Sequence, residues 1–140
     1  MAPIHILGAG LSGLSAAILL ARAGREVHVH ELRADSGVRF AGDFEGIENW
    51  TSPVDFWDEL LAWGIDPGDW KSTGLRQIDL GLEGDRIETL KSSRVAFRLV
   101  ERGTRPHTLD QGLKRQALSA GAHLHYNARR DRARKAPSGS

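Results

Sequence analysis

The sequence predicts an α/β fold, in which a parallel sheet with helices is interrupted by a small antiparallel β insert. Three features indicate this fold. A strand, glycine turn, helix and second strand fill the first 31 residues; β-prone runs separated by turns occupy the middle; and a capped helix followed by a short strand lies near the end. With 140 residues, a single domain is expected.

The first 31 residues follow a β-α-β pattern that ends on an acid. They comprise, in order, the apolar run 4–7, the G-x-G-x-x-G glycines Gly8, Gly10 and Gly13, a small-and-aliphatic helix at 14–23, the β-prone run 27–30, and Glu31. This order matches the fingerprint of a Rossmann-like FAD/NAD(P)-binding unit, in which the acid follows by about 20 residues. A glycine-rich turn in an ordinary α/β domain is the alternative.

Each glycine in the motif is expected to be required for a different physical reason. Gly8 permits the tight exit from the strand, Gly10 leaves room for a diphosphate to approach the backbone, and Gly13 allows the helix to pack closely on the sheet. The free N–H groups around Leu11 and Ser12 are then expected to face the phosphates, where the helix dipole adds positive charge.

Glu31 is predicted to bind the adenosine ribose. A carboxylate at the end of the second strand can accept hydrogen bonds from both ribose hydroxyls. The same charge would repel a 2′-phosphate, which argues against NADP.

The amino-acid composition limits the classes of molecule that this chain is expected to bind. The net charge of +1 gives no global field that favours nucleic acid or an anionic membrane. The absence of cysteine excludes disulfides and thiolate metal sites and fits a cytoplasmic protein. No basic residue precedes the first apolar run, which disfavours a signal peptide, and that run is too short to span a membrane.

Residues 32–52 are expected to form a loop that contains a turn at Asp35-Ser36-Gly37. If this loop folds back over the cofactor, Arg39 can pair with the diphosphate through charge-assisted hydrogen bonds. The alternative is a solvated loop arginine.

Residues 8–40 resemble the amino terminus of FAD-dependent oxidoreductases of the glutathione-reductase fold, which include amine oxidases, phytoene desaturases, aromatic hydroxylases and geranylgeranyl reductases. Many members carry G-G-R after the ribose-binding acid, and this chain has Gly37-Val38-Arg39. The resemblance implies FAD-binding roles for Gly8, Gly10, Gly13, Glu31 and Arg39. Residues 41–50 also resemble a segment of some members, for which no chemistry is implied.

The middle of the chain is predicted to hold one helix and the antiparallel insert, at about 65–105. Ser52-Pro53-Val54-Asp55 opens a helix that Gly64 ends, with an apolar face that includes Leu61 and Trp63. The tryptophans from Trp50 to Trp70 are interpreted as packing residues rather than as a ring-stacking ligand site.

Strands are expected at 75–82 and 86–90, joined by a turn at 83–85, and again at 95–100. Arg102 follows the last strand. The residues alone favour a surface arginine there, whereas the family resemblance implies a second candidate for the diphosphate or the ribityl chain.

Thr108 begins a capping-box pattern, and the helix that follows ends at Gly121. Residues 123–127 are predicted to form a strand beside 27–30, so that the Rossmann-like domain covers 1–127 and the resemblance covers 4–127. His28, His30, His123 and His125 would then share a sheet face. Although four imidazoles could approach one another, we expect half-buried strand histidines bonded to backbone or water, and no metal.

Residues 128–140 carry a basic run followed by Pro-Ser-Gly-Ser and are predicted to be a disordered tail that does not bind nucleic acid. The later strand and Gly-Asp segment that the resembled family uses near the flavin do not follow. We therefore expect an FAD-binding amino-terminal portion of a flavin-dependent oxidoreductase, catalytically inactive as these 140 residues alone, with catalytic residues unknown and a missing carboxy-terminal portion or partner subunit. A truncated, inert fragment and a stand-alone NAD- or ADP-binding module are the alternatives.

Overall fold

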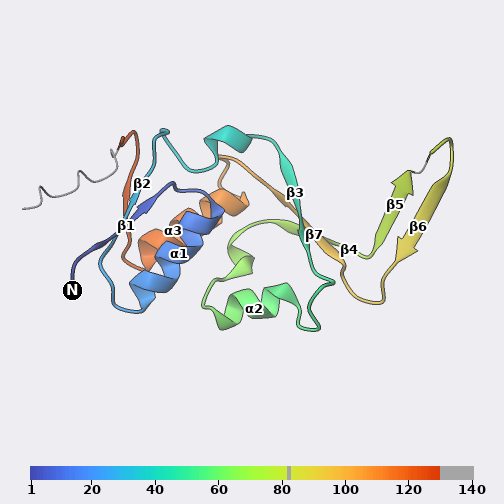
Figure 1. Cartoon of the computed structure of the whole chain (residues 1–140), viewed down its shortest axis with the longest axis horizontal. Helices are drawn as coiled ribbons and strands as arrows, with labels where there is room; N and C mark the ends of the chain where they lie inside the picture. The colour runs from blue at the N-terminus through green and yellow to red at the C-terminus, as the bar shows by residue number, and fades with distance from the viewer. Residues whose placement is uncertain (82, 130–140) are drawn as a thin grey trace, which may run out of the picture.

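The fold is centred on a three-stranded parallel sheet. A computed structural model describes residues 1–81 and 83–129, in which β1 (Ile4–Leu7), β2 (Val27–His30) and β8 (His123–His125) lie in the order β1-β2-β8 (Figure 1). Ile4 pairs with Val27, and Val29 pairs with Leu124. The α/β fold class and the placement of the last strand beside the second are both confirmed.

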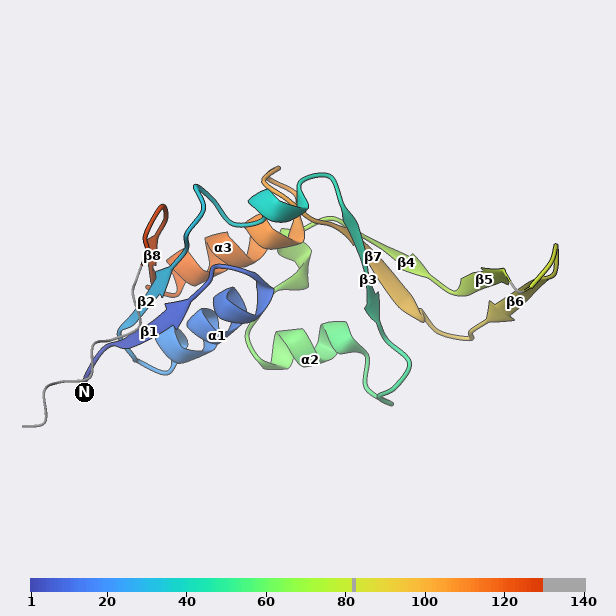
Figure 2. The same cartoon turned by 45° about the horizontal axis from the view of Figure 1, so that its top comes forward.

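Two helices cover one face of this sheet. α1 (Leu11–Arg22) and α3 (Leu109–Ser119) lie side by side against it (Figure 2). Because strand side chains alternate between faces, Val27 and Val29 point into the core while His28 and His30 point away from it. The residues that these three elements bury in the core are Leu14, Ala17 and Ile18 of α1, Val27 and Val29 of β2, and Leu109, Leu113 and Ala117 of α3.

A second, antiparallel sheet extends away from the core. It contains β3 (Phe44–Glu48), β7 (Phe97–Glu101) and β4 (Ser72–Leu75) in the order β3-β7-β4. The expectation of a loop throughout 32–52 is therefore wrong, because β3 forms a full ladder with β7. The sequence FEGIE of β3 is mostly exposed and contains Gly46, so its strand state depends on the distant partner rather than on its own pattern.

A β-hairpin projects from the end of that sheet. β5 (Gln77–Gly81) pairs only with β6 (Ile87–Lys91) within the described chain, and Figure 1 shows the pair far from the helices. The hairpin was predicted, but the single strand expected at 75–82 is divided at Arg76, where pairing changes from β7 to β6.

The helix in the middle of the chain begins later than predicted. α2 (Phe56–Ala62) has Asp55 as its N-cap, whose carboxylate accepts from Trp57 N at 2.9 Å. Ser52 does not cap the helix. Leu61 and Trp63, predicted for the apolar face, are 55% and 50% exposed, because only the Leu60 side of this short helix meets the core.

The remaining short elements are the 3-10 turns η1 (Val38–Phe40) and η2 (Pro67–Asp69). After η2, Trp70 is buried against α3, where Gly112 leaves room for its ring, as the packing interpretation predicted. In the described residues no helix has both the length and the hydrophobicity needed to cross a bilayer. The predicted tail lies outside the described residues from 130 onward.

Candidate functional site

Within the described residues, the first amides of α1 have no hydrogen-bond partner after the glycine turn. Gly8 leaves β1 with φ +100° and donates its N–H to His30 O at 2.8 Å. Gly10 is the N-cap of α1 in an extended conformation, and it has no side chain to cap the helix. The N–H groups of Leu11, Ser12 and Gly13 are therefore left for an anion at this helix end.

The space around the other two glycines differs sharply. A Cβ built on Gly10 would have no heavy atom within 4 Å, so the backbone there is open to a ligand. A Cβ built on Gly13 would lie 2.0 Å from Gly8 O. The predicted packing role of Gly13 is thus confirmed, while contact between Gly10 and a ligand stays a prediction.

The carboxylate of Glu31 lies at the mouth of the turn. One oxygen accepts from Ala9 N at 2.9 Å, and the other accepts from Arg33 N at 2.9 Å. These two backbone bonds fix the carboxylate at the carboxyl ends of β1 and β2, beside the open backbone of Gly10. Binding of a ribose diol by this carboxylate stays a prediction.

A cavity of about 210 Å³ is lined by four of the eight predicted site residues. Gly10, Glu31, Arg39 and Arg102 all line it, although they come from four separate parts of the chain. Gly8 and Glu31 also line an adjacent cavity of about 230 Å³ with Leu32 and Ala128. The structure therefore brings five of the predicted residues to one edge of the parallel sheet, whereas Leu11 lines a separate apolar pocket with Ser15 and Leu60.

Arg39 lies exposed in η1, at the rim of the first cavity. Its guanidinium carbon is 5.7 Å from the centre of the Phe40 ring. Within the described parts of the chain, no carboxylate forms an ion pair with it. Its donors are therefore available to an anionic ligand.

Arg102 is buried, so the expectation of a surface arginine is wrong. Its Nε and Nη2 donate to the two oxygens of Asp110 at 2.9 and 3.0 Å, and its Nη1 donates to Glu45. The Phe40 ring lies 4.5 Å from its guanidinium carbon. Burial disfavours the charge, but the bonds to Asp110 and Glu45 hold the pKa of Arg102 above its ordinary value.

Asp110 is the partner that sequence reasoning missed. It is fully buried, and besides Arg102 it accepts from Gly103 N at 2.9 Å. An acid in the first turn of a helix is usually assigned to the helix dipole. Only its pairing with an arginine eight residues earlier distinguishes it, and that pairing depends on the turn at Gly103, which has φ +121°.

The loop after β2 is anchored to α3, which fixes the position of Arg39. Lys114 Nζ is 2.7 Å from Asp35 Oδ1, and Gln111 donates to Ser36 O at 3.0 Å. Gly37, at φ +81°, lies so close to Gly103 that an added Cβ would be 2.5 Å from Gly103 O. These contacts hold the loop against α3 and the turn at Gly103.

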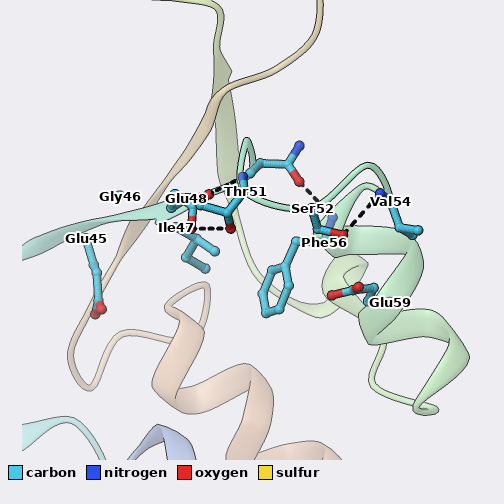
Figure 3. Close-up of a pocket in the computed structure, with 10 residues that line it drawn as sticks. Glu45, Gly46, Ile47, Glu48, Thr51, Ser52, Val54, Phe56 and Glu59 are labelled. Carbon is cyan, nitrogen blue, oxygen red and sulfur yellow. Dashed lines mark hydrogen bonds between the residues drawn. The ribbon is translucent and has the colours of Figure 1, made fainter.

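A separate cavity of about 440 Å³ lies between β3 and α2 (Figure 3). Figure 3 shows Phe56 and Glu59 of α2 facing Ile47 of β3 across it. Its acid Glu48 already accepts from Trp50 N and Thr51 N at 2.9 and 2.7 Å. None of the predicted site residues lines this cavity.

Comparison with known proteins agrees with this geometry. Residues 6–46 match the family described as an NAD(P)-binding Rossmann-like domain. The chain is 55% identical over 42 residues to hydroxysqualene dehydroxylase of Rhodopseudomonas palustris and 48% identical over 48 residues to that of Sinorhizobium fredii. These stretches cover 30% and 34% of this chain, but only 10% and 12% of the relatives.

Solved structures share the fold over a much longer stretch. A geranylgeranyl bacteriochlorophyll reductase-like protein from Thermoplasma acidophilum aligns with TM-score 0.65 and 18% identity, over 89% of this chain and 30% of that one. PqsL, described as a probable FAD-dependent monooxygenase from Pseudomonas aeruginosa, aligns with TM-score 0.62 and 17% identity, over 96% of this chain and 35% of that one.

A tetrameric 2-methyl-3-hydroxypyridine-5-carboxylic acid oxygenase gives TM-score 0.63 and 20% identity, over 89% of this chain and 31% of that one. The chain thus spans about a third of the solved structures that it resembles. The predicted resemblance is confirmed, in that the Rossmann-like sheet and its antiparallel insert are a fold that this chain shares with oxygenases and reductases.

Proposed function

We propose that this chain is the FAD-binding portion of a flavin-dependent oxidoreductase and that its described residues hold the ADP half of FAD. The observation that carries the proposal is the meeting of Glu31, the open backbone at Gly10 and the exposed Arg39 at one cavity. A diol acceptor, free helix amides and an available cation are what an adenosine diphosphate requires.

The residues present fit the ADP group. The amides of Leu11 and Ser12 would bind the diphosphate, helped by the dipole of α1. Glu31 would accept the ribose hydroxyls in place of the Ala9 and Arg33 amides, or together with them. Arg39 would pair with a diphosphate oxygen, whereas Arg102, bonded to Asp110 and Glu45, would line the cavity and position its wall.

The negative charge of Glu31 limits which dinucleotide is expected to bind. Glu31 would lie beside a 2′-phosphate, so NADP is disfavoured. The Gly37-Val38-Arg39 loop and the flavin-dependent monooxygenase named among the structures of the same fold favour FAD over NAD. A stand-alone NAD- or ADP-binding module is the second candidate, favoured by the NAD(P)-binding description of residues 6–46.

When bound, FAD supplies hydride-transfer chemistry through its flavin ring. The residues of this chain would fix the opposite end of the cofactor and would not contact a substrate. We propose no substrate, because the aligned stretches cover about a tenth of the hydroxysqualene dehydroxylases.

The test is a titration of the purified chain with FAD, NAD and ADP by calorimetry, together with its visible absorbance. Glu31→Gln is expected to weaken FAD and ADP roughly ten- to hundredfold, because it removes charged hydrogen-bond acceptors. Gly10→Val is expected to abolish binding of both. Glu26→Gln, at the opposite end of β2, is the matched control and should leave both affinities unchanged.

A chain that binds NAD but neither FAD nor ADP would overturn the first proposal and favour the second. Unchanged ADP affinity in both Glu31→Gln and Gly10→Val would overturn the site itself.

A further inference from the structure

The face of the parallel sheet opposite the helices carries a histidine array. It consists of His5 of β1, His28 and His30 of β2, and His123 and His125 of β8. The strand register places them in rows: the His28 and His123 rings stack with centroids 4.7 Å apart, and the His30 and His125 rings stack at 4.9 Å. His5 completes the array, and sequence reasoning did not include it.

One pair in this array has its proton positions fixed by a carboxylate. Glu26 Oε1 accepts from His28 Nε2 at 3.0 Å, so the proton of neutral His28 is on Nε2. The other nitrogen, Nδ1, then carries a lone pair and accepts a hydrogen bond from Nε2 of His125 at 2.9 Å.

A carboxylate that accepts from the remote nitrogen of a histidine is the usual support of a metal ligand. It sets the tautomer, orients the ring and raises the basicity of the ligating nitrogen. Glu26 provides this support for His28, and stacking on His123 adds a second restraint on the ring.

The nitrogen separation, which is set by the hydrogen bond between the two rings, also matches one coordination geometry. With metal–nitrogen bonds of about 2.0–2.1 Å, two ligands at a right angle lie about 2.9 Å apart, whereas two at the tetrahedral angle lie about 3.3 Å apart. The observed 2.9 Å therefore fits adjacent positions of a square-planar or octahedral ion. Cu²⁺ and Ni²⁺ prefer such geometry with imidazole ligands.

From these contacts we propose that His28 Nδ1 and His125 Nε2 form a two-imidazole site for Cu²⁺ or Ni²⁺, with Glu26 as the supporting carboxylate. Binding moves the proton of His125 from Nε2 to Nδ1, and water completes the coordination sphere. Within residues 1–81 and 83–129 no three histidine, cysteine, aspartate or glutamate side chains converge on a metal position, so the site has two protein ligands. The inference revises the sequence expectation of no metal, and it does not depend on the proposed nucleotide site.

The test is a titration of the chain with CuCl₂ by calorimetry, with electron paramagnetic resonance of the bound copper. His28→Gln and His125→Gln should each lower copper affinity at least tenfold, on the order of the losses seen when a metal shell is disturbed. The double variant should lose little more copper affinity than either single variant, because each single substitution already removes one of the two nitrogens that chelate the ion. The spectrum of the wild-type complex should show two coordinated nitrogens.

Two control variants separate this site from unspecific binding. His107→Gln removes a histidine that also pairs with a carboxylate, Glu101, but away from the array, and it should not change copper affinity. Glu26→Gln should weaken copper about tenfold and leave ADP affinity unchanged. Equal copper affinity in wild type, His28→Gln and His125→Gln, with all three chains folded by circular dichroism, would overturn the proposal, as would losses no larger than that of His107→Gln.

Discussion

Replacing Gly13 by alanine tests whether the third glycine of the motif serves packing alone. The added Cβ would lie 2.0 Å from Gly8 O, 3.2 Å from Gly8 C and 3.4 Å from Ile6 Cγ2. The first contact is with backbone, so no side chain can rotate away, and α1 must shift from the turn. Overpacking of this kind costs about 1–3 kcal/mol, and the better helix propensity of alanine offsets up to about 1 kcal/mol.

The expected result is a loss of about 1–2 kcal/mol in the free energy of unfolding, measured by urea denaturation with circular dichroism. Gly10→Ala is the matched control. Its Cβ would meet no heavy atom within 4 Å, and its φ of −85° suits alanine, so stability should stay within about 0.5 kcal/mol of wild type.

ADP affinity should be lowered in Gly10→Ala, the variant whose stability is expected to be unchanged. Gly10→Ala places a methyl group where the diphosphate would approach, so ADP affinity should fall although the fold is intact. If Gly13→Ala is as stable as wild type, or if Gly10→Ala is the more damaging to stability, the assignment of packing to Gly13 and of ligand approach to Gly10 is wrong.

Three further predictions concern the charged residues around the cavity. Arg102→Met should cost about 3–5 kcal/mol of unfolding free energy by urea denaturation, because it leaves Asp110 buried and without a cation, whereas Arg105→Met at a 66% exposed side chain should cost less than about 1 kcal/mol. Arg39→Gln should leave stability unchanged and weaken ADP about tenfold by calorimetry, and equal affinity would remove Arg39 from the site. Although burial raises the pKa of Asp35, Lys114 and the Ser36 amide outweigh it and hold the folded value below the unfolded value of about 3.9. Asp35 therefore stabilises the fold above that pH and loses this contribution as the pH falls through its folded pKa, so Asp35→Asn should show a smaller loss of stability than wild type between about pH 5 and about pH 3.

The parallel sheet and the glycine turn could be predicted because their signals are local. Gly8 and Gly13 are required by backbone shape within a few residues, and Thr108 caps α3 from the adjacent position. The ribose-binding role of Glu31 could be proposed from its position about 20 residues after the glycine motif. Once the β-α-β unit is recognised, that spacing places an acid at the end of the second strand.

The elements that were missed depend on distant partners. β3 is held by β7, which lies about 50 residues later in the chain, and its own sequence carries little strand pattern. The position of Arg102 depends on Asp110, Glu45 and Phe40, which come from three separate segments. No periodicity in the sequence links such residues, so burial of this arginine could not be anticipated.

Arg39 and Arg102 both line the cavity and carry the same charge, but Arg102 has a structural role and Arg39 the proposed binding role. Arg102 is buried and bonded to Asp110 and Glu45, and Asp110 also accepts from Gly103 N in the turn against which Gly37 packs. Because Gly37 is held there, the next turn of chain presents Arg39 at the rim with its guanidinium exposed. An arginine whose donors are satisfied by protein has little left for a phosphate, while one that forms no ion pair within the described residues keeps its N–H donors for a ligand. The buried ion pair therefore acts on ligand binding through the placement of Arg39. Replacing Arg102 should weaken ADP even when the variant is studied well below its unfolding temperature.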